Sequence, residues 1–495
     1  MSFLCFSVSV ADSCHRSTEP LRDFADRPVH SCLPPPECAI RYRRVLVAAF
    51  EATWSPFKYF APWRLCGLTP GTLHLQKNNL TVLLYTIFIR LYRAGIGIAA
   101  LFNPKAKLWT AGRKNILSRL QADFAGNAAK VIWMHCASLG EFEQGRTVLE
   151  ALKQKYQDHK ILLTFFSPSG FEVRKNYPAA DWVYYLPLDT RYNAATFIKT
   201  VRPALAIFVK YEYWYHFLKN LNREKIPVLL ISAIFRADAI FFKPQGAFHR
   251  KMLHFFNHIF VQNAESKERL RAIIGENKIT VAGDTRFDRV TQIAAGFEPI
   301  PLIESFIAPG KFVIVAGSTW VDDEYNLSYF NKLDNNDSIL IIAPHEIDPA
   351  HIKRVKGLFP GSVLFSELKG TSYLKSTILI IDNIGMLSRL YYYATITYIG
   401  GGFNPSGIHN TLEAAVFSKP VLFGPNYQKF LEAIELIKKE GAISYYDDKE
   451  LFIEIEKLKT QPGLLNRYST NAGTFVKERT GATGIICNYI QLNFR

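Results

Sequence analysis

The sequence predicts an α/β protein made of two doubly wound domains, with a membrane-associating helix ahead of them. From Val131 onward, short apolar runs alternate with helical patterns, and each run is continuously apolar rather than alternating with polar residues. Continuous runs are typical of parallel strands that helices cover on both faces. A chain of 495 residues is also too long for one hydrophobic core, which predicts two domains.

The apolar runs restart after Pro299 and Pro301, so we place the linker between the two domains near residues 291–310. The predicted strands of the first domain occupy residues 131–134, 161–166, 182–186, 204–209, 227–231, 258–261 and 278–281. Those of the second domain occupy residues 311–316, 338–343, 363–365, 377–381, 395–399 and 420–423. Two such domains place a cleft between the carboxyl ends of their strands.

The whole chain divides into segments of different character. Residues 116–295 form the predicted first domain, and residues 296–475 form the second. We expect residues 476–495 to be a helix that packs back on the first domain. Residues 1–78 lack sustained periodicity, which predicts either a disordered extension or a start site assigned too far upstream. Residues 79–115 hold the membrane-anchor helix and a basic segment.

Charge and cysteine usage restrict the partners and the compartment. A net charge of +16 and a pI near 9.3 favour an anionic partner: nucleic acid, anionic lipid or a phosphorylated substrate. The sequence has no zinc-ligand spacing, RNA-binding aromatic motif or helix-turn-helix signature, so we expect no nucleic acid as partner. The 7 cysteines show neither metal-ligand nor disulfide spacing, which predicts a reducing, cytoplasmic environment.

Leu80–Phe102 is an apolar stretch almost long enough to span a bilayer. Arg90 and Arg93 lie in its middle, where charge is costly in a membrane, and a basic segment follows as far as Lys114. This combination favours an anchor on the cytoplasmic surface of a membrane. The alternative is a helix buried inside the first domain.

A glycine-rich unit lies at residues 395–425 of the second domain. An apolar run ends in three glycines, a helical pattern follows from about His409 to Phe417, and a second apolar run closes the unit. Glycines let backbone N–H groups approach a ligand, and the start of a helix attracts an anion. His409, Asn410 and Glu413 add polar groups on one side of that helix. The alternative is a tight turn of an ordinary α/β domain.

Several loops that follow predicted strands carry polar residues. Glu141 follows the first strand and either acts as a general base or stabilises the dipole of the helix it begins. Arg286 follows the last strand of the first domain and either faces negative charge in the cleft or lies in a solvated turn. In the second domain, polar strand-end loops fit a nucleotide better than a metal. We expect Asp322 and Asp323 to lie on an exposed helix start.

Together these segments resemble the Kdo transferases, the 3-deoxy-D-manno-octulosonic acid transferases of lipopolysaccharide synthesis (glycosyltransferase family 30). The resemblance runs from about Leu80 to the C-terminus and rests on ordered motifs. They are Ala-Ser-Leu-Gly-Glu at 137–141, Tyr-Leu-Pro-Leu-Asp at 185–189, Glu-Tyr-Trp at 212–214, Gly-Asp-Thr-Arg-Phe-Asp at 283–288, and His-Asn-Thr-Leu-Glu at 409–413.

The resemblance implies a GT-B fold and an inverting, metal-independent transfer of Kdo from CMP-Kdo to a hydroxyl of a lipid A precursor, lipid IVA. It places the enzyme at the cytoplasmic face of the inner membrane, with no cofactor. It implies that Glu141 is the catalytic base and that Glu212 and Arg286 stabilise the transition state. It assigns CMP to one further set of residues: Pro344, His345, Ile384, Gly385, Met386, Asn410, Thr411, Leu412 and Glu413.

The sequence departs from the family pattern at three positions. His345 stands where many members have Arg, Met386 where many have Glu, and Lys210 where many have an acidic residue. Two other functions fit parts of the sequence. A different GT-B enzyme of envelope glycolipid synthesis would use another nucleotide sugar, and is told apart by CMP binding. A non-enzymatic membrane-surface or nucleic-acid-binding protein would explain the charge but not Glu141.

Overall fold

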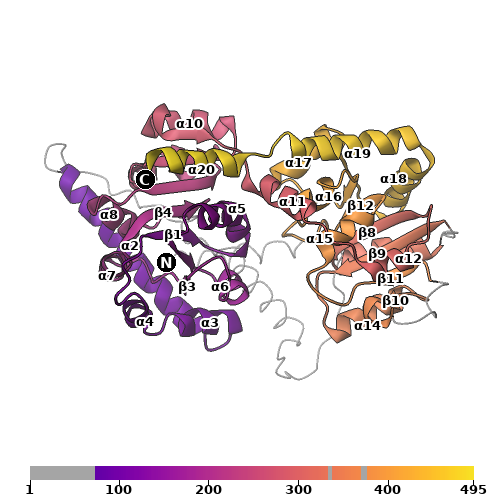
Figure 1. Cartoon of the computed structure of the whole chain (residues 1–495), viewed down its shortest axis with the longest axis horizontal. Helices are drawn as coiled ribbons and strands as arrows, with labels where there is room; N and C mark the ends of the chain where they lie inside the picture. Colours follow the sequence, from indigo (N-terminus) through magenta and orange to yellow (C-terminus); the bar gives the residue numbers. More distant parts are fainter. Residues whose placement is uncertain (1–72, 333–336, 369–375, 495) are drawn as a thin grey trace, which may run out of the picture. The chain divides into compact units, whose positions relative to one another are not determined.

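The computed structural model describes residues 73–332, 337–368 and 376–494, which form two seven-stranded parallel sheets (Figure 1). The strands of the first sheet are β1 (Val131–Cys136), β2 (Lys160–Phe165), β3 (Trp182–Tyr185), β4 (Pro203–Val209), β5 (Val228–Ala233), β6 (His258–Val261) and β7 (Ile279–Val281). Those of the second are β8 (Phe312–Thr319), β9 (Ser338–Pro344), β10 (Val363–Leu364), β11 (Ile378–Ile380), β12 (Ile396–Ile399), β13 (Val421–Phe423) and β14 (Ala442–Ser444).

Both sheets are doubly wound. Their strand orders are β3-β2-β1-β4-β5-β6-β7 and β10-β11-β9-β8-β12-β13-β14. In each, the chain starts at a central strand, winds to one edge, returns to the centre and winds to the other edge, and every paired strand is parallel. The predicted α/β class is confirmed. Each predicted apolar run coincides with a strand, and β14 is a strand that the sequence analysis missed.

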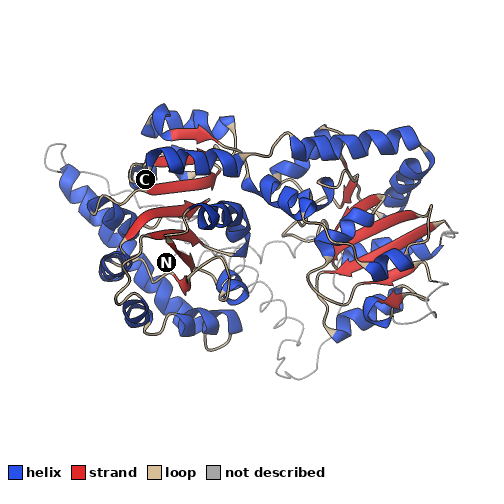
Figure 2. Cartoon of the chain, viewed as in Figure 1, coloured by secondary structure: helices blue, strands red, loops and turns tan. Residues whose placement is uncertain are grey.

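Helices flank both sheets (Figure 2). Those ahead of the first sheet are α2 (Leu73–Ala99), α3 (Pro104–Gly112) and α4 (Ile116–Asp123). Those of the first sheet are α5 (Leu139–Lys155), α6 (Pro168–Arg174), α7 (Arg191–Val201), α8 (Tyr215–Arg223), α9 (Ala247–Leu253), α10 (Ala264–Ile274) and α11 (Thr285–Ala295). The rest are α12 (Pro301–Phe306), α13 (Val321–Leu327), α14 (Pro349–Leu358), α15 (Leu387–Leu390), α16 (Leu412–Ala415), α17 (Leu431–Lys438), α18 (Asp448–Thr460), α19 (Pro462–Lys477) and α20 (Ala482–Asn493). Short 3₁₀ turns are η1 (Ile240–Phe242), η2 (Pro244–Gly246), η3 (Glu276–Lys278), η4 (Ser328–Lys332), η5 (Phe365–Glu367) and η6 (Tyr391–Tyr393).

The central strands form the cores because helices remove both of their faces from water. All residues of β1 are buried, and each fully buried aliphatic side chain contributes about 1.5–3 kcal/mol. The last helix, α20, belongs to this first core: Ala482, Ile486 and Ile490 pack with β1 and β4. Conversely, Phe287 and Val290 of α11 pack into the core of the second sheet.

Helix α2 is attached to the first sheet at one side only. Tyr85 donates a hydrogen bond to Asp189 over 2.5 Å, and Asp189 also accepts the backbone N–H groups of His216 and Phe217. Over Leu80–Ala99 the helix is long and apolar enough to cross a membrane by length and composition, yet only 17% of that window is buried. The alternative of a helix buried in the first domain is therefore wrong.

Candidate functional site

Glu141 stands at the carboxyl edge of the first sheet, in the first turn of α5, which directly follows β1. Ser138, the residue that precedes α5, donates a hydrogen bond to the Glu141 carboxylate. Burial raises the pKa of Glu141 above its usual value, and the nearby charge of Glu212 raises it further, while Ser138 and Lys210 partly offset both effects. The result is a carboxylate with increased affinity for a proton.

Glu212 is held in a buried network at the end of β4. Its side chain accepts hydrogen bonds from Trp214 Nε1 over 2.6 Å, and His135 Nε2 lies 3.0 Å from the same carboxylate oxygen. His135 is fully buried, and its Nδ1 lies 2.9 Å from the Thr164 hydroxyl. This network fixes the Glu212 carboxylate at a position where its charge acts on Glu141.

His135 is a residue to which the sequence analysis gave no role. The available signal was a polar side chain at the end of β1, whose other residues are apolar. Lys210, at one of the departures from the family pattern, also lies in this group. Its backbone is in the left-handed region, with φ of 69°. Burial lowers the pKa of Lys210 and the positive charge of Arg286 lowers it further, whereas Glu141 opposes both effects.

Arg286, in the first turn of α11, is bound on two sides by carboxylates. Its Nε and one terminal nitrogen donate to Asp284 over 2.9 and 2.7 Å, and the other terminal nitrogen donates to Glu432 of α17 over 2.7 Å. Burial alone would lower the pKa of Arg286, but the two carboxylates outweigh it and raise this pKa. The predicted residues Glu141, Glu212 and Arg286 thus all act on one another or on Lys210 electrostatically.

The three glycines that follow β12 serve the packing of backbone against backbone. A Cβ at Gly400 would lie 2.1 Å from the Ser318 carbonyl oxygen, and one at Gly402 would lie 2.4 Å from the Gly424 nitrogen. Gly401 has φ of +89°, a conformation that favours glycine. These glycines therefore allow close approach to β8 and to the loop after β13, while their close approach to a ligand stays a prediction.

Asp322 is exposed at the start of α13 as expected, but Asp323 beside it is 1% exposed, which corrects the second half of that expectation. One of the Asp323 carboxylate oxygens accepts the backbone N–H groups of Gly401 and Trp320, over 2.7 and 2.9 Å. The other accepts the Tyr398 hydroxyl over 2.6 Å. Burial raises the pKa of Asp323 to about 6. Asp323 thus ties the glycine-rich turn to the loop after β8.

The residues assigned to CMP come together in part around an aromatic stack. The Trp320 and His345 rings stack with their centroids 4.5 Å apart. The ring of His409, which follows the glycine-rich turn, has its centroid 4.5 Å from that of His345. Trp320 Nε1 donates to His409 Nε2 over 3.0 Å. Burial lowers the pKa of His409 to about 4, and the neighbouring His345 contributes to the same shift. Trp320 was not predicted; its signal is an aromatic residue directly after Gly-Ser-Thr.

The segment from Asn410 to Glu413 becomes helical only at Leu412. Helix α16 covers only Leu412–Ala415, so the helix predicted from about His409 to Phe417 is present but shorter at both ends. Asn410 accepts the backbone N–H of Leu412 and donates to Glu413 over 3.0 Å, and this side-chain turn replaces the first helical turn. Burial raises the pKa of Glu413. The Thr411 hydroxyl is 1% exposed and has no hydrogen-bond partner among the described residues.

The remaining assigned residues differ in exposure. Pro344 ends β9 and is buried, while Ile384 is 87% exposed and Gly385 has φ of +100°. Met386 is 5% exposed, and its side chain belongs to the core of the second sheet. A ligand at residues 384–386 would therefore meet Ile384 and backbone groups, not the Met386 side chain.

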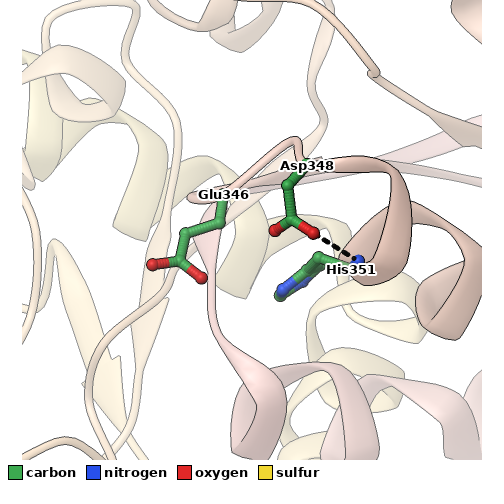
Figure 3. Close-up of side chains that lie close together, drawn as sticks. All are labelled: Glu346, Asp348 and His351. Carbon is green, nitrogen blue, oxygen red and sulfur yellow. Dashed lines mark hydrogen bonds between the residues drawn. The ribbon is translucent and has the colours of Figure 1, made fainter.

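Glu346, Asp348 and His351 lie close together just after β9 (Figure 3). Asp348 caps α14 by accepting two of its backbone N–H groups, each over 3.1 Å. His351 Nε2 lies 2.7 Å from a Glu324 oxygen, and Arg354 lies 2.8 Å from His351 Nδ1. Both ring nitrogens of His351 thus have protein partners, and the Arg354 guanidinium is adjacent. This group is therefore the helix cap formed by Asp348 next to the buried pair of His351 and Glu324.

Comparison with known sequences shows which proteins this chain resembles. Residues 114–289 match the family model described as 3-Deoxy-D-manno-octulosonic-acid transferase (kdotransferase). The 3-deoxy-D-manno-octulosonic acid transferase of Aquifex aeolicus is 28% identical over 339 residues, covering 67% of this chain and 87% of that protein. The 3-deoxy-D-manno-octulosonic acid transferase of Rickettsia felis is 26% identical over 368 residues, covering 71% of this chain and 77% of that protein.

Solved structures agree with the fold. The UDP-GlcNAc 2-epimerase of Neisseria meningitidis, bound to UDP-GlcNAc, superposes with a TM-score of 0.53 at 16% identity, over 74% of this chain and 100% of that one. A putative UDP-N-acetylglucosamine 2-epimerase from Listeria monocytogenes gives 0.51 at 12% identity, over 74% and 97%. These similarities show the two-domain GT-B type of fold. The family model and the named relatives show that this chain is similar to the Kdo transferases, a family of glycosyltransferases.

Proposed function

We propose that this protein transfers Kdo from CMP-Kdo to a hydroxyl of a lipid A precursor, lipid IVA, with inversion at the anomeric carbon and with Glu141 as the base. The observation that carries the proposal is the placement of Glu141: a half-buried carboxylate at the carboxyl edge of a parallel sheet, hydrogen-bonded to Ser138 and beside Lys210. Ligands of doubly wound sheets bind at this edge.

In this mechanism the acceptor oxygen attacks the anomeric carbon while CMP departs with the electron pair of the broken bond. Glu141 accepts the proton of the attacking hydroxyl. Its raised pKa makes it a stronger base than a solvated carboxylate, and a positioned base contributes about 10²–10⁴ to a rate. Glu212 assists indirectly, because its buried charge raises the pKa of Glu141 and His135 and Trp214 hold it in place.

The second sheet is proposed to hold CMP-Kdo near the Trp320, His345 and His409 stack. An aromatic surface that stays partly exposed suits the base of the nucleotide. The unpartnered Thr411 hydroxyl and the Asn410–Glu413 turn supply polar groups close by. Since His345 replaces an Arg that many members carry, we expect the phosphate to depend more on backbone groups here. The proposal includes no resident metal or cofactor, so transfer should persist in a chelator.

We place the enzyme at the cytoplasmic face of the inner membrane, where α2 meets the bilayer. Support comes from the apolar window Leu80–Ala99, of which 17% is buried, and from the net charge of +16, which suits a phosphorylated glycolipid.

The test incubates the protein with CMP-Kdo and a tetra-acylated lipid A precursor, and follows CMP release and the mass of the acceptor. We expect the wild type to add Kdo and Glu141→Gln to lose about 10²–10⁴ in rate while still binding CMP. Glu265→Gln is the matched control, because Glu265 also lies in the first turn of a helix, α10, that follows a strand of the same sheet. If Glu141 only stabilised a helix dipole, both variants would behave alike.

Other outcomes separate the alternatives. Binding of CMP without transfer would keep the donor site and point to another acceptor. Binding of UDP in place of CMP would support a GT-B enzyme that uses a different nucleotide sugar. Failure to bind either nucleotide would refute the proposal.

A further inference from the structure

One face of α2 is an uninterrupted apolar stripe. At about 100° per residue, six exposed aliphatic side chains project within about 60° of one direction. They are Leu80, Leu83, Leu84, Ile87, Leu91 and Ile98. Leu91 is 65% exposed and Ile98 is 66% exposed. The opposite face, with Tyr85, Ile89 and Ile96, is buried against the protein.

A cavity of about 580 Å³ lies on one flank of this stripe, between α2 and the start of α7. Arg90 and Arg93 of α2 line it together with Arg191, the first residue of α7. Thr86 and Asn193 add polar groups, and no acidic residue lines it. On α2, Thr86, Arg90 and Arg93 project about 80° to 140° away from the apolar stripe, so the cavity borders the stripe along the helix.

The three arginines are uncompensated. None of their side chains forms an ion pair or a hydrogen bond within the part of the chain that the structure describes. The first turn of α7 also holds no acidic residue; the Thr190 hydroxyl caps it as a neutral acceptor, so no negative charge offsets the positive end of the helix dipole there. The positive charge of Arg191 also acts on His216. Burial lowers the pKa of His216 to about 4, and the charges of Lys219 and Arg191 lower it further.

We propose that this cavity binds the phosphate of an anionic phospholipid, so that α2 lies along the membrane surface rather than across it. The acyl chains of the same leaflet contact the apolar stripe, and the headgroup enters the cavity beside it. Apolar and cationic surfaces on adjoining sides of one helix match the two parts of such a lipid. A spanning α2 would instead place Arg90 and Arg93 in hydrocarbon, where charge is costly.

The test is flotation of the full chain with vesicles of phosphatidylcholine, with and without phosphatidylglycerol, in the absence of donor and acceptor. The triple variant Arg90→Gln, Arg93→Gln, Arg191→Gln should lose the phosphatidylglycerol-dependent gain in binding by about 100-fold. Each basic residue near an anionic surface contributes about fivefold. Arg191→Gln alone should lose about fivefold, although it leaves the sequence of α2 unchanged.

The matched control removes the same charge from exposed positions at the far ends of α7 and α8: Lys199→Gln, Arg223→Gln and Lys225→Gln. It should lose less than about threefold. Equal losses in both triple variants would show general charge attraction and overturn the proposal. An unchanged affinity for vesicles, with a raised KM for acceptor in detergent, would also overturn it and assign the cavity to an acceptor phosphate. Because vesicle binding is read without transfer, this test does not depend on the proposed reaction.

Discussion

The bridge from Arg286 to Glu432 yields a prediction that separates folding from catalysis. Replacing Arg286 by Met leaves Asp284 and Glu432, whose side chains are 8% and 9% exposed, without their cationic partner. Removing one partner of a buried pair costs about 3–5 kcal/mol. For domains of this size each kcal/mol lowers Tm by about 2–4 °C, so we expect a fall of about 6–20 °C. Glu432→Gln keeps an acceptor oxygen and should cost about 1.5–3 kcal/mol.

The assay is thermal unfolding of Arg286→Met, Glu432→Gln and the double variant, with Kdo transfer measured on each. The double variant should be less destabilised than the sum of the singles by about 1–3 kcal/mol, because Glu432 no longer carries an unpaired charge. Arg289→Met is the control one turn further along α11. Its nearest carboxylates lie 3.6 and 4.0 Å away, so it should cost about 1 kcal/mol or less.

A coupling below about 0.5 kcal/mol would refute the reasoning, since it would mean that the bridge contributes nothing as a pair. Activity gives the second result. If Arg286 also faces charge that develops in the transition state, the double variant recovers stability without recovering transfer. If the role of Arg286 is only to join α11 to α17, transfer recovers together with stability.

Three further predictions concern single residues. Glu141→Gln should raise Tm while it abolishes most transfer. A carboxyl group whose pKa is raised on folding loses stability as pH rises above 4.5, so the variant gains stability relative to wild type above that pH. Gly402→Ala should lower the free energy of unfolding by about 1–3 kcal/mol or more, because its Cβ would lie 2.4 Å from a backbone nitrogen. The control is Gly463→Ala in α19, whose Cβ would meet nothing within 4 Å, and it should cost less than about 1 kcal/mol in the same thermal unfolding measurement. Thr411→Val should stabilise the fold by about 1–3 kcal/mol, since it removes a buried unpartnered hydroxyl, and should weaken CMP binding in calorimetry if that hydroxyl contacts the donor.

The strands were predictable because the pattern that identifies them is local. Helices cover both faces of each sheet, so a strand such as β4 is an unbroken apolar run that the sequence displays directly. The strand β14 was missed because it does not display such a run. It lies at a sheet edge, has three residues, and only Ala442 is fully buried.

The site was predictable as a set of loops but not as a set of contacts. Parallel strands bring their carboxyl ends together, which places Glu141 and Glu212 at the same edge without any knowledge of side chains. What the side chains then do depends on partners far away in sequence. Arg286 meets a carboxylate 146 residues away, and Glu212 meets His135 across 77 residues.

The two errors in the second domain have a common physical cause. Periodicity predicted a helix from His409, but the Asn410 side chain satisfies the backbone that a first turn would have used. Charge predicted that Asp323 lies on the surface, but three donors converge on its carboxylate. In both cases a polar side chain serves the backbone of a tight turn, and composition alone gives no sign of that.

The return of α20 to the first sheet means that this chain cannot be divided cleanly at the linker. Helix α20 lies against the first sheet (Figure 1), where Ala482 and Ile486 complete the core around β1. Thr147 of α5 meets Thr483 over 2.7 Å. A fragment that stops after α11 would expose that apolar surface to water. Limited proteolysis within α19 should therefore destabilise the first sheet rather than release it. Insertions and deletions at the C-terminus carry the same penalty, and a gene fusion is better placed where α20 is left intact.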